Sequence, residues 1–295
     1  MLMILIFQMK NEITKEVVIL YHAECNDGFG GAWAAWKKFG SEADYIPVSH
    51  DSYPDNFTNK EIYTVDLTLP EEITEKLLET NKRLTSIDHH ITAEKITKMT
   101  QDFSFDNNHS GAFLSWKYFH PDKLVPKLLL FVEDSDLWKG EYSETPKVTV
   151  ALGLFDFDFE VWDKIAEDFE SPEKIDDYLM KGKVILNYEE KLLKYLEKQA
   201  QLVEFEGNKV YSVNTPRFLR NSVAYILYKK LPPFSISWIQ EKNTIHISLR
   251  SDGTVDVSEI AQKYGGGGHK AAAGFSFPAG QPFPWKIVKE KIVKD

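Results

Sequence analysis

The chain has almost no cysteine, no hydrophobic run long enough to cross a bilayer and no excess of basic residues. Its single cysteine, Cys25, cannot form a disulfide within the chain, so we expect a protein of the reducing cytoplasm. The apolar start, residues 1–9, is too short to span a membrane and lacks the basic n-region and cleavage site of a signal peptide. We therefore expect a soluble protein without a membrane partner, whose first residues form an early strand or an extended start.

Acidic residues outnumber basic residues, 45 to 35, which gives a formal net charge of −10. Proteins that track long nucleic acids usually have a basic surface, because neutralising phosphates drives that binding. The charge therefore disfavours a long nucleic-acid track, while a short phosphorylated ligand on a local basic patch remains compatible with it. With 43% hydrophobic and 27% charged residues among 295, the composition is globular and excludes a disordered or fibrous protein.

The first half of the chain alternates short apolar, β-branched runs with helical patterns. We expect strands at 17–21, 62–65 and 84–87, and helices at 30–39 and 70–80. Repeated strand–helix–strand units predict a parallel sheet with right-handed crossovers. Ligands of such sheets bind at the carboxyl ends of the strands.

The region from about residue 110 to 202 has a mostly helical pattern. It ends in a long charged segment, 175–202, that is typical of an exposed connecting helix. The elements expected after it are strands at 209–213, 235–240 and 244–249 and helices at 218–230 and 255–264. We predict an α/β protein with a parallel-sheet domain at 1–185, a helical linker at 186–205 and a smaller α/β domain at 206–295. Its active site is expected in the cleft between the two domains.

Acids and histidines follow the predicted strands of the first half. His22 follows the first strand, Asp66 the second, and the group Asp88, His89 and His90 the third. Singly, such residues are most often turn formers, helix caps or satisfied histidines. Parallel strand ends meet at one edge, however, and clustered carboxylates repel strongly unless cations neutralise them. Oxygen and imidazole donors suit Mn²⁺ or Mg²⁺, and a pair of such ions activates water for attack on phosphorus.

A second motif, GGGGHKAAAG at 265–274, follows a helical pattern near the end of the chain. A flexible linker is one interpretation of four glycines. Glycine backbone beside a basic residue can also bind an anion through its N–H groups. Arg250, at the end of a predicted strand, can clamp a phosphate with two hydrogen bonds, although alone it would be read as a solvated charge.

Taken in this order, the segments YHAECNDG, YTVD, SIDHH and GGGGHKAAAG resemble the DHH phosphoesterase family with its DHH-associated C-terminal domain. The resemblance covers essentially the whole chain. The glycine motif is similar to that of oligoribonucleases and single-strand exonucleases, and differs from that of the inorganic pyrophosphatase branch. The resemblance implies hydrolysis of short oligonucleotides to nucleoside monophosphates at a centre of two divalent cations. Mn²⁺ is the first candidate for these cations and Mg²⁺ the second.

The resemblance also implies a role for each motif residue. His22 would bind the first metal, Asp66 would bridge both, and the second would be bound by Asp27, His89 and Asp134. Asp88 would orient the histidines, and His90 would lie near the scissile phosphate. Asp136, close to Asp134 in the segment VEDSDLW, would serve only as a supporting or capping group. The substrate would be held by Arg250, His269 and the backbone of Gly266, Gly267 and Gly268.

One residue departs from the family pattern. Cys25 stands where the family commonly has the first of two aspartates, and a thiolate is softer than Mn²⁺ prefers. Cys25 is therefore either a bystander or the sign of an altered first metal site. The variant HxxCxDG also resembles a bacterial subgroup of oligoribonucleases or cyclic-nucleotide phosphodiesterases.

Several alternatives remain open at this stage. The substrate could be a cyclic nucleotide, a linear dinucleotide or 3′,5′-bisphosphorylated adenosine. A single-strand exonuclease is disfavoured by the net charge of −10. A nucleotide-binding sensor that has lost catalysis is favoured only by Cys25. The oligomeric state, a homodimer included, is not indicated by the sequence.

Overall fold

The computed structural model describes residues 13–49 and 53–288, so the expectation for residues 1–9 lies outside the described part. The chain divides into two units, Met1–Leu186 and Asn187–Asp295, which are called unit 1 and unit 2 here. Both units combine helices with a sheet. The predicted α/β fold, with an N-terminal parallel sheet and a smaller second unit, is confirmed.

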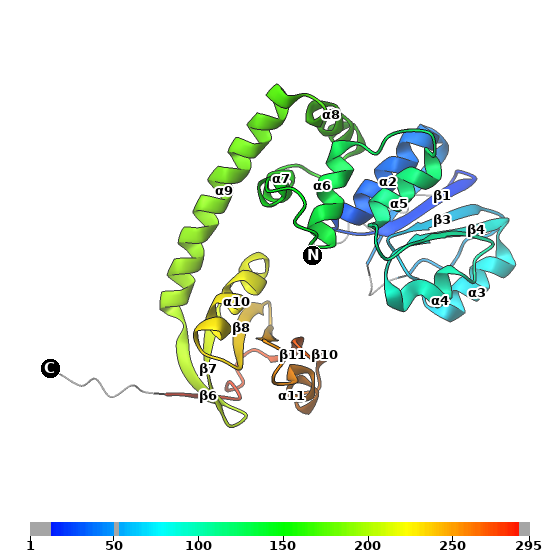
Figure 1. Cartoon of the computed structure of the whole chain (residues 1–295). Helices are drawn as coiled ribbons and strands as arrows, with labels where there is room; N and C mark the ends of the chain where they lie inside the picture. Colours follow the sequence, from blue (N-terminus) through cyan, green and yellow to red (C-terminus); the bar gives the residue numbers. More distant parts are fainter. Residues whose placement is uncertain (1–12, 50–52, 289–295) are drawn as a thin grey trace. The chain divides into compact units, whose positions relative to one another are not determined.

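Unit 1 is built on a five-stranded parallel sheet in the order β2-β1-β3-β4-β5 (Figure 1). Its strands are β1 (Val17–His22), β2 (Ala43–Val48), β3 (Glu61–Val65), β4 (Arg83–Asp88) and β5 (Asp102–Phe105). The three inner strands are buried on both faces, as apolar runs without alternation indicate. Because β1, β3 and β4 are parallel neighbours, their carboxyl ends lie side by side.

Helices cover both faces of this sheet. Residues Ile19 and Val65 join one core with Trp33 of α2 (Asn26–Phe39) and Trp116 of α5 (Gly111–Phe119). On the opposite face, α3 (Glu71–Thr80) packs Leu77 into a second core. The remaining helices of this unit are α4 (Glu94–Thr97), α6 (Lys127–Asp136), α7 (Thr145–Leu152), α8 (Phe159–Phe169) and the first part of α9 (Pro172–Gln199). The predicted helical character of about 110–202 is confirmed as far as Gln199.

The sequence-based prediction for unit 1 differs from the structure at three places. Helix α2 begins at Asn26, four residues before the expected start, because glycines in its first two turns hide the helical pattern. Those glycines permit close packing: a Cβ at Gly28 would lie 2.3 Å from the carbonyl oxygen of His22. Strands β2 and β5 were not predicted. Both lie at sheet edges, β2 contains Pro47, and β5 has only four residues.

Unit 2 contains a seven-stranded sheet in the order β10-β11-β9-β8-β7-β6-β12. Its strands are β6 (Gln201–Phe205), β7 (Asn208–Asn214), β8 (Phe234–Glu241), β9 (Thr244–Ser251), β10 (Gly267–His269), β11 (Ala272–Pro278) and β12 (Lys286–Ile287). Among the described strands of this sheet, only β7 and β8 pair in parallel. The connecting helix ends at Gln199, not at 202, because residues 201–205 pair with β7 as β6.

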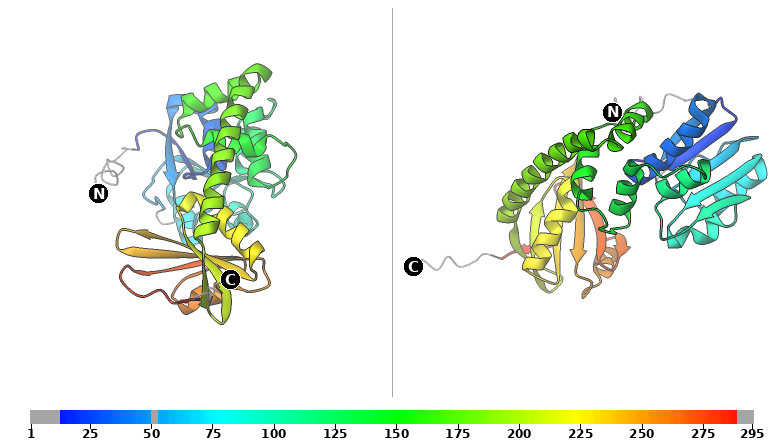
Figure 2. Two further views of the ribbon diagram at one scale, coloured as in Figure 1. Left: turned by 90° about the vertical axis from the view of Figure 1, so that its left-hand side faces the viewer. Right: turned by 45° about the horizontal axis from the view of Figure 1, so that its top comes forward.

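Two helices cover opposite faces of the unit 2 sheet. Val223 of α10 (Arg220–Lys230) packs on Val213 of β7, whereas Ile260 of α11 (Val257–Lys263) joins a core that contains Val210 of the same strand. Residues 210 and 213 point to opposite faces, since side chains alternate along a strand. Figure 2 shows α10 lying along one face of the sheet. In the described part of the chain, no helix combines the length and apolar character needed to cross a membrane.

Candidate metal centre and anion pocket

Histidines and aspartates converge at the carboxyl edge of the unit 1 sheet. His89 Nε2 lies 3.3 Å from Asp66 Oδ1 and 3.6 Å from both Asp27 Oδ2 and Asp136 Oδ2. Asp66 also approaches His22 Nδ1 at 3.4 Å and His90 Nδ1 at 3.7 Å. Asp66 therefore stands at the centre of the group, in contact with all three histidines.

The ligand atoms form three overlapping groups, each with its atoms within 4.8 Å of one another. The groups are His22, Cys25 and Asp66; Asp66, His89 and His90; and Asp27, His89 and Asp136. Asp66 and His89 each belong to two of them. Cys25 is thus not remote from the site: its Sγ lies 3.8 Å from Asp66 Oδ2. Shared members are the arrangement that two neighbouring cations with a bridging carboxylate require.

The structure brings Asp136, and not Asp134, into this group. Asp134 is buried and its two oxygens accept hydrogen bonds from the backbone N–H of Glu141, at 2.7 Å, and from the hydroxyl of Thr145. Both aspartates lie on α6 rather than at a strand end. Side chains two residues apart on a helix point about 200° apart, so only one of the two can face the site.

Asp88 orients the residues that follow it. Its Oδ1 accepts hydrogen bonds from the backbone N–H groups of His89 and His90, at 2.7 and 2.9 Å, and lies 2.8 Å from the ring Nδ1 of His90. Its Oδ2 accepts a hydrogen bond from Thr68 at 2.8 Å. A carboxylate with all these donors fixes the backbone of His89 and His90 and the His90 ring, whose side chain is half exposed.

Asp27 is held by a helix N-terminus that the sequence analysis did not single out. Its two oxygens accept hydrogen bonds from the backbone N–H of Gly111, at 2.7 Å, and of Ala112, at 2.8 Å. These are the first residues of α5, where unpaired N–H groups and the helix dipole favour an anion. Gly111 is needed at this point, because a Cβ there would lie 2.7 Å from the Cβ of Asp66. The sequence signal is Ser110 before an apolar helical run, the pattern of an N-cap.

Backbone strain is also located at the site. Asp66 has a φ of 51°, in the left-handed region, directly after β3. Aspartate and asparagine tolerate this region better than most residues. The turn directs the Asp66 side chain into the group, where it is almost completely buried.

The charges of the group depend on one another. Burial raises the pKa of Asp27 well above its usual value, and repulsion from Asp66 and Asp136 adds to this effect. Burial likewise opposes ionisation of Asp66, but its hydrogen bond with His22 and its contact with His89 hold its pKa below the usual value. The hydrogen bond with Asp66 raises the pKa of His22 to about 10. The carboxylates therefore require positive charge, which protonated imidazoles supply here.

The residues present fit divalent cations. Asp66 Oδ1 and His89 Nε2 are buried and lie 3.3 Å apart, but neither atom forms a hydrogen bond of good geometry among the residues described. Such atoms are rare in folded proteins and usually mark a bound water or ion. A cation beside them would replace the imidazole protons and use the freed nitrogen and carboxylate oxygens as ligands. The donors, apart from Cys25, are those of Mn²⁺, Mg²⁺ or Zn²⁺ sites.

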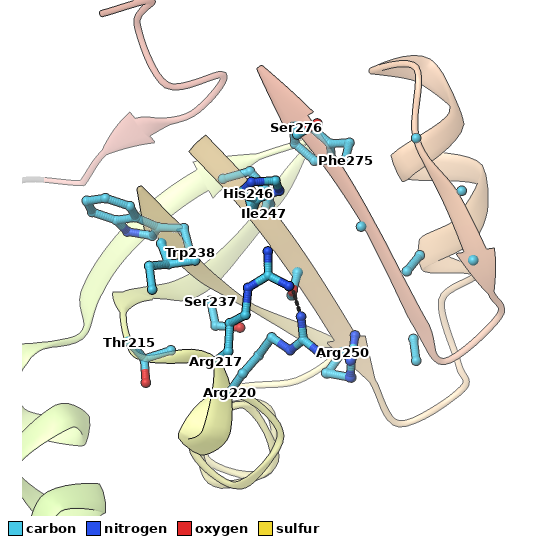
Figure 3. Close-up of a pocket in the computed structure, with 18 of the residues that line it drawn as sticks. Thr215, Arg217, Arg220, Ser237, Trp238, His246, Ile247, Arg250, Phe275 and Ser276 are labelled. Carbon is cyan, nitrogen blue, oxygen red and sulfur yellow. Dashed lines mark hydrogen bonds between the residues drawn. The ribbon is translucent and has the colours of Figure 1, made fainter. Parts of the chain in front are cut away.

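Unit 2 contains its own pocket, of about 450 Å³. Of the residues assigned to substrate binding from the sequence, Arg250, Gly266, Gly267 and Gly268 line it, whereas His269 is exposed at the end of β10 and does not. The glycine motif is no linker, because its two halves pair as antiparallel strands, with Gly267 opposite Gly274. Figure 3 shows residues that the sequence did not indicate, among them Arg217, Arg220 and His246.

Comparisons with known proteins agree with this architecture. Residues 215–292 match the model of the DHHA1 domain. Uncharacterized protein R106 of Acanthamoeba polyphaga mimivirus is 30% identical over 286 residues, which cover 88% of this chain and 67% of that protein. The solved structure of the pGpG-specific phosphodiesterase PggH from Vibrio cholerae is 15% identical with a TM-score of 0.53, covering 90% of this chain and 94% of its own. The solved DHH domain of a member of the s1p family of ribosomal proteins is 15% identical with a TM-score of 0.50. The match covers 88% of this chain and 82% of that one.

The chain therefore has the fold of these solved structures, with a parallel-sheet unit followed by a second α/β unit. Residues 215–292 form a DHHA1 domain, and the chain belongs to one family with the mimivirus protein R106.

Proposed function

We propose that this protein is a divalent-cation-dependent phosphodiesterase of the DHH phosphoesterase family. It would hydrolyse short oligonucleotides to nucleoside monophosphates, as the oligoribonuclease branch of that family does. The observation that supports this most directly is the group around Asp66, in which three aspartates and three histidines approach one another and two buried atoms lack a hydrogen-bond partner among the described residues. Buried polar atoms are nearly always hydrogen-bonded, so a close contact between Asp66 Oδ1 and His89 Nε2 without a hydrogen bond favours a cation that both atoms would bind.

The side chains of the group have distinct tasks in this proposal. Asp66 and His89 are shared between neighbouring cation sites, and Asp27, held by the α5 N-terminus, and Asp136 complete one of them. When bound, the cations polarise the phosphoryl group and lower the pKa of a water molecule. His90, whose Nδ1 is held by Asp88 and whose side chain is half exposed, would donate a hydrogen bond from Nε2 to a phosphoryl oxygen.

Two features support a short substrate. The pocket of unit 2, at about 450 Å³, lies within the range of small-molecule sites, so it can hold one nucleotide end. The net charge of −10 disfavours a long strand. The likeness to PggH, whose name gives pGpG as its substrate, favours a linear dinucleotide as the second candidate among the substrates considered.

A substrate panel tests this proposal. We expect Mn²⁺-dependent release of mononucleotides from RNA of two to five nucleotides, with rates that fall by about tenfold or more for strands of twenty nucleotides, because a long strand needs a basic track. Chelation of the cations should stop the reaction. Cyclic dinucleotides and 3′,5′-bisphosphorylated adenosine are measured beside them. Equal rates on long strands would favour the exonuclease, and no turnover on any member of the panel would exclude a hydrolase.

Cys25 distinguishes catalysis from binding alone. We expect Cys25→Ser to retain hydrolysis within about tenfold of the wild type, because the thiol borders the site and Asp66 remains in place. In the sensor alternative the wild type is silent and Cys25→Asp, which adds a harder oxygen donor, gains activity. Cation binding by calorimetry, measured on all three proteins, shows whether any change in rate follows a change in metal affinity.

A further inference from the structure

Trp138 is an exposed tryptophan beside the candidate metal centre. It is 92% exposed, although tryptophan is highly buried on average in folded proteins. It follows Asp136 by two residues, and Asp136 Oδ2 lies 3.6 Å from His89 Nε2 in the centre. Consecutive Cα atoms are about 3.8 Å apart, so the Cα atoms of residues 136 and 138 are separated by about 7.6 Å at most. The indole therefore begins close to the place where the proposed function puts the scissile phosphate.

The backbone of Trp138 is strained. Its φ is 54°, in the left-handed region, where a bulky side chain is a genuine outlier. Glycine adopts this conformation without a steric cost. Strained residues persist where the surrounding structure holds them, and they are concentrated at active sites and ligand-binding sites. Folding stability does not explain why an exposed tryptophan occupies a position suited to glycine.

The segment that carries Trp138 is held firmly to the last turns of α6. The backbone N–H of Lys139 donates to the carbonyl oxygen of Asp134 at 3.2 Å, and Lys139 Nζ donates to Glu133 Oε1 at 2.5 Å. Asp134 Oδ1 accepts a further hydrogen bond from the backbone N–H of Glu141, at 2.7 Å. Both acids of α6 are buried. The turn is thus fixed before any ligand arrives, which lowers the entropy that binding would cost.

The surroundings of Trp138 are charged. Lys139 Nζ and His109 Nδ1 lie 2.5 and 3.1 Å from the carboxylate of Glu133, and Asp136 precedes the indole by two residues. A protein or membrane surface would require a continuous apolar patch of several side chains. A planar base requires only one aromatic face. A single indole among charged neighbours therefore favours a nucleobase as its ligand.

We propose that Trp138 stacks on the nucleobase next to the scissile phosphate, so that the centre selects nucleotides over sugar phosphates and phosphate chains without a base. Every base has a π-face, so stacking tolerates all four bases. Asp134, which does not join the cation group, would then fix the turn that presents Trp138. This inference rests on the proposed function for the choice of substrate.

Binding of the expected product tests the stacking without hydrolysis. The probes are adenosine 5′-monophosphate and ribose 5-phosphate, which differ by the base, measured by calorimetry on the full chain with Mn²⁺. We expect the wild type to bind the nucleotide about tenfold to a hundredfold more tightly, because base–aromatic stacking has effects of this size. Trp138→Ala should lose most of this difference, and Trp138→Phe, which keeps a smaller ring, should retain most of it.

Leu124→Ala is the matched control. Leu124 is 91% exposed and lies in unit 1 beyond the C-terminal end of α5, whereas the N-terminus of α5 binds Asp27 of the centre. This variant should keep the wild-type difference between the two probes.

Hydrolysis provides the second measurement, which decides where the two differ. The ratio of kcat/KM for a dinucleotide to that for the same dinucleotide lacking one base should fall by about tenfold in Trp138→Ala. A Trp138→Ala protein that keeps the wild-type ratio overturns the assignment and leaves the proposed function standing. If the wild type hydrolyses no dinucleotide, the proposed function fails, and a difference between the two probes that depends on Trp138 still supports stacking.

Urea unfolding separates stacking from a structural role of the indole. Trp138→Gly should be at least as stable as the wild type, because glycine relieves the left-handed strain and the exposed ring makes few contacts. It should nevertheless lose the preference for a base, as Trp138→Ala does. Reduced stability with an unchanged preference would assign the indole a packing role and overturn the proposal.

Discussion

Replacing Asp66 with asparagine is expected to reduce kcat/KM on short RNA by about a hundredfold to a thousandfold. A loss of this size is typical when a group that stabilises charge in the transition state is removed. Asp66 contacts His22, His89 and His90 and belongs to two of the three ligand groups. Asparagine keeps the shape and tolerates the left-handed backbone, so the loss would reflect the missing charge rather than misfolding. The measurements are steady-state rates at saturating Mn²⁺ and the number of bound cations by calorimetry.

The matched control for this substitution is Asp163→Asn. Asp163 is a partly exposed aspartate of unit 1 that pairs with Lys37 at 2.6 Å and belongs to none of the ligand groups. It should leave both the rate and the number of bound cations unchanged. Full turnover by Asp66→Asn, or an unchanged number of cations, would remove the basis of the two-cation proposal.

Replacing Gly111 with alanine is expected to impair the centre without changing any of its ligands. The added Cβ would lie 2.7 Å from Asp66 Cβ, 3.2 Å from Asp66 Cα and 3.0 Å from Asp27 Oδ2, so α5 and the turn at Asp66 must separate. Separation would also break the hydrogen bond from Gly111 to Asp27. Overpacking of this kind costs about 1–3 kcal/mol of unfolding free energy, and we expect Mn²⁺ affinity to fall with it. Urea unfolding and cation titration measure the two effects.

Gly153→Ala is the control for the glycine substitution. Gly153 follows α7 with a φ of −63°, and the nearest atom to a Cβ there is a carbonyl oxygen at 3.4 Å. Its stability and its cation affinity should match those of the wild type. An unchanged cation affinity in Gly111→Ala would show that the α5 N-terminus does not hold the centre in place.

The sheet of unit 1 could be predicted where local pattern and topology agree. The runs at β1, β3 and β4 are apolar and β-branched, and parallel pairing then places their ends together. The edge strand β2 was missed because Pro47 interrupts its pattern, and the start of α2 was missed because glycine is a poor helix former. In both places packing against the rest of the sheet outweighs local preference.

The choice between Asp134 and Asp136 shows a different limit. The family resemblance favoured Asp134, and no local sequence pattern distinguishes Asp134 from Asp136. Only the helical geometry of α6, together with Thr145 and the backbone of residue 141 as partners for Asp134, separates them. Arg220 was missed for a similar reason, because its position depends on how α10 packs against β9 and not on any motif.

The backbone at position 66 has a consequence for how this protein tolerates change. With a φ of 51°, this residue must be one that accepts a left-handed turn, and glycine and asparagine satisfy that condition as well as aspartate does. Selection for a folded, abundant protein would therefore accept aspartate, asparagine or glycine at position 66. Selection for the proposed chemistry would accept only aspartate, because only its carboxylate can bind a cation.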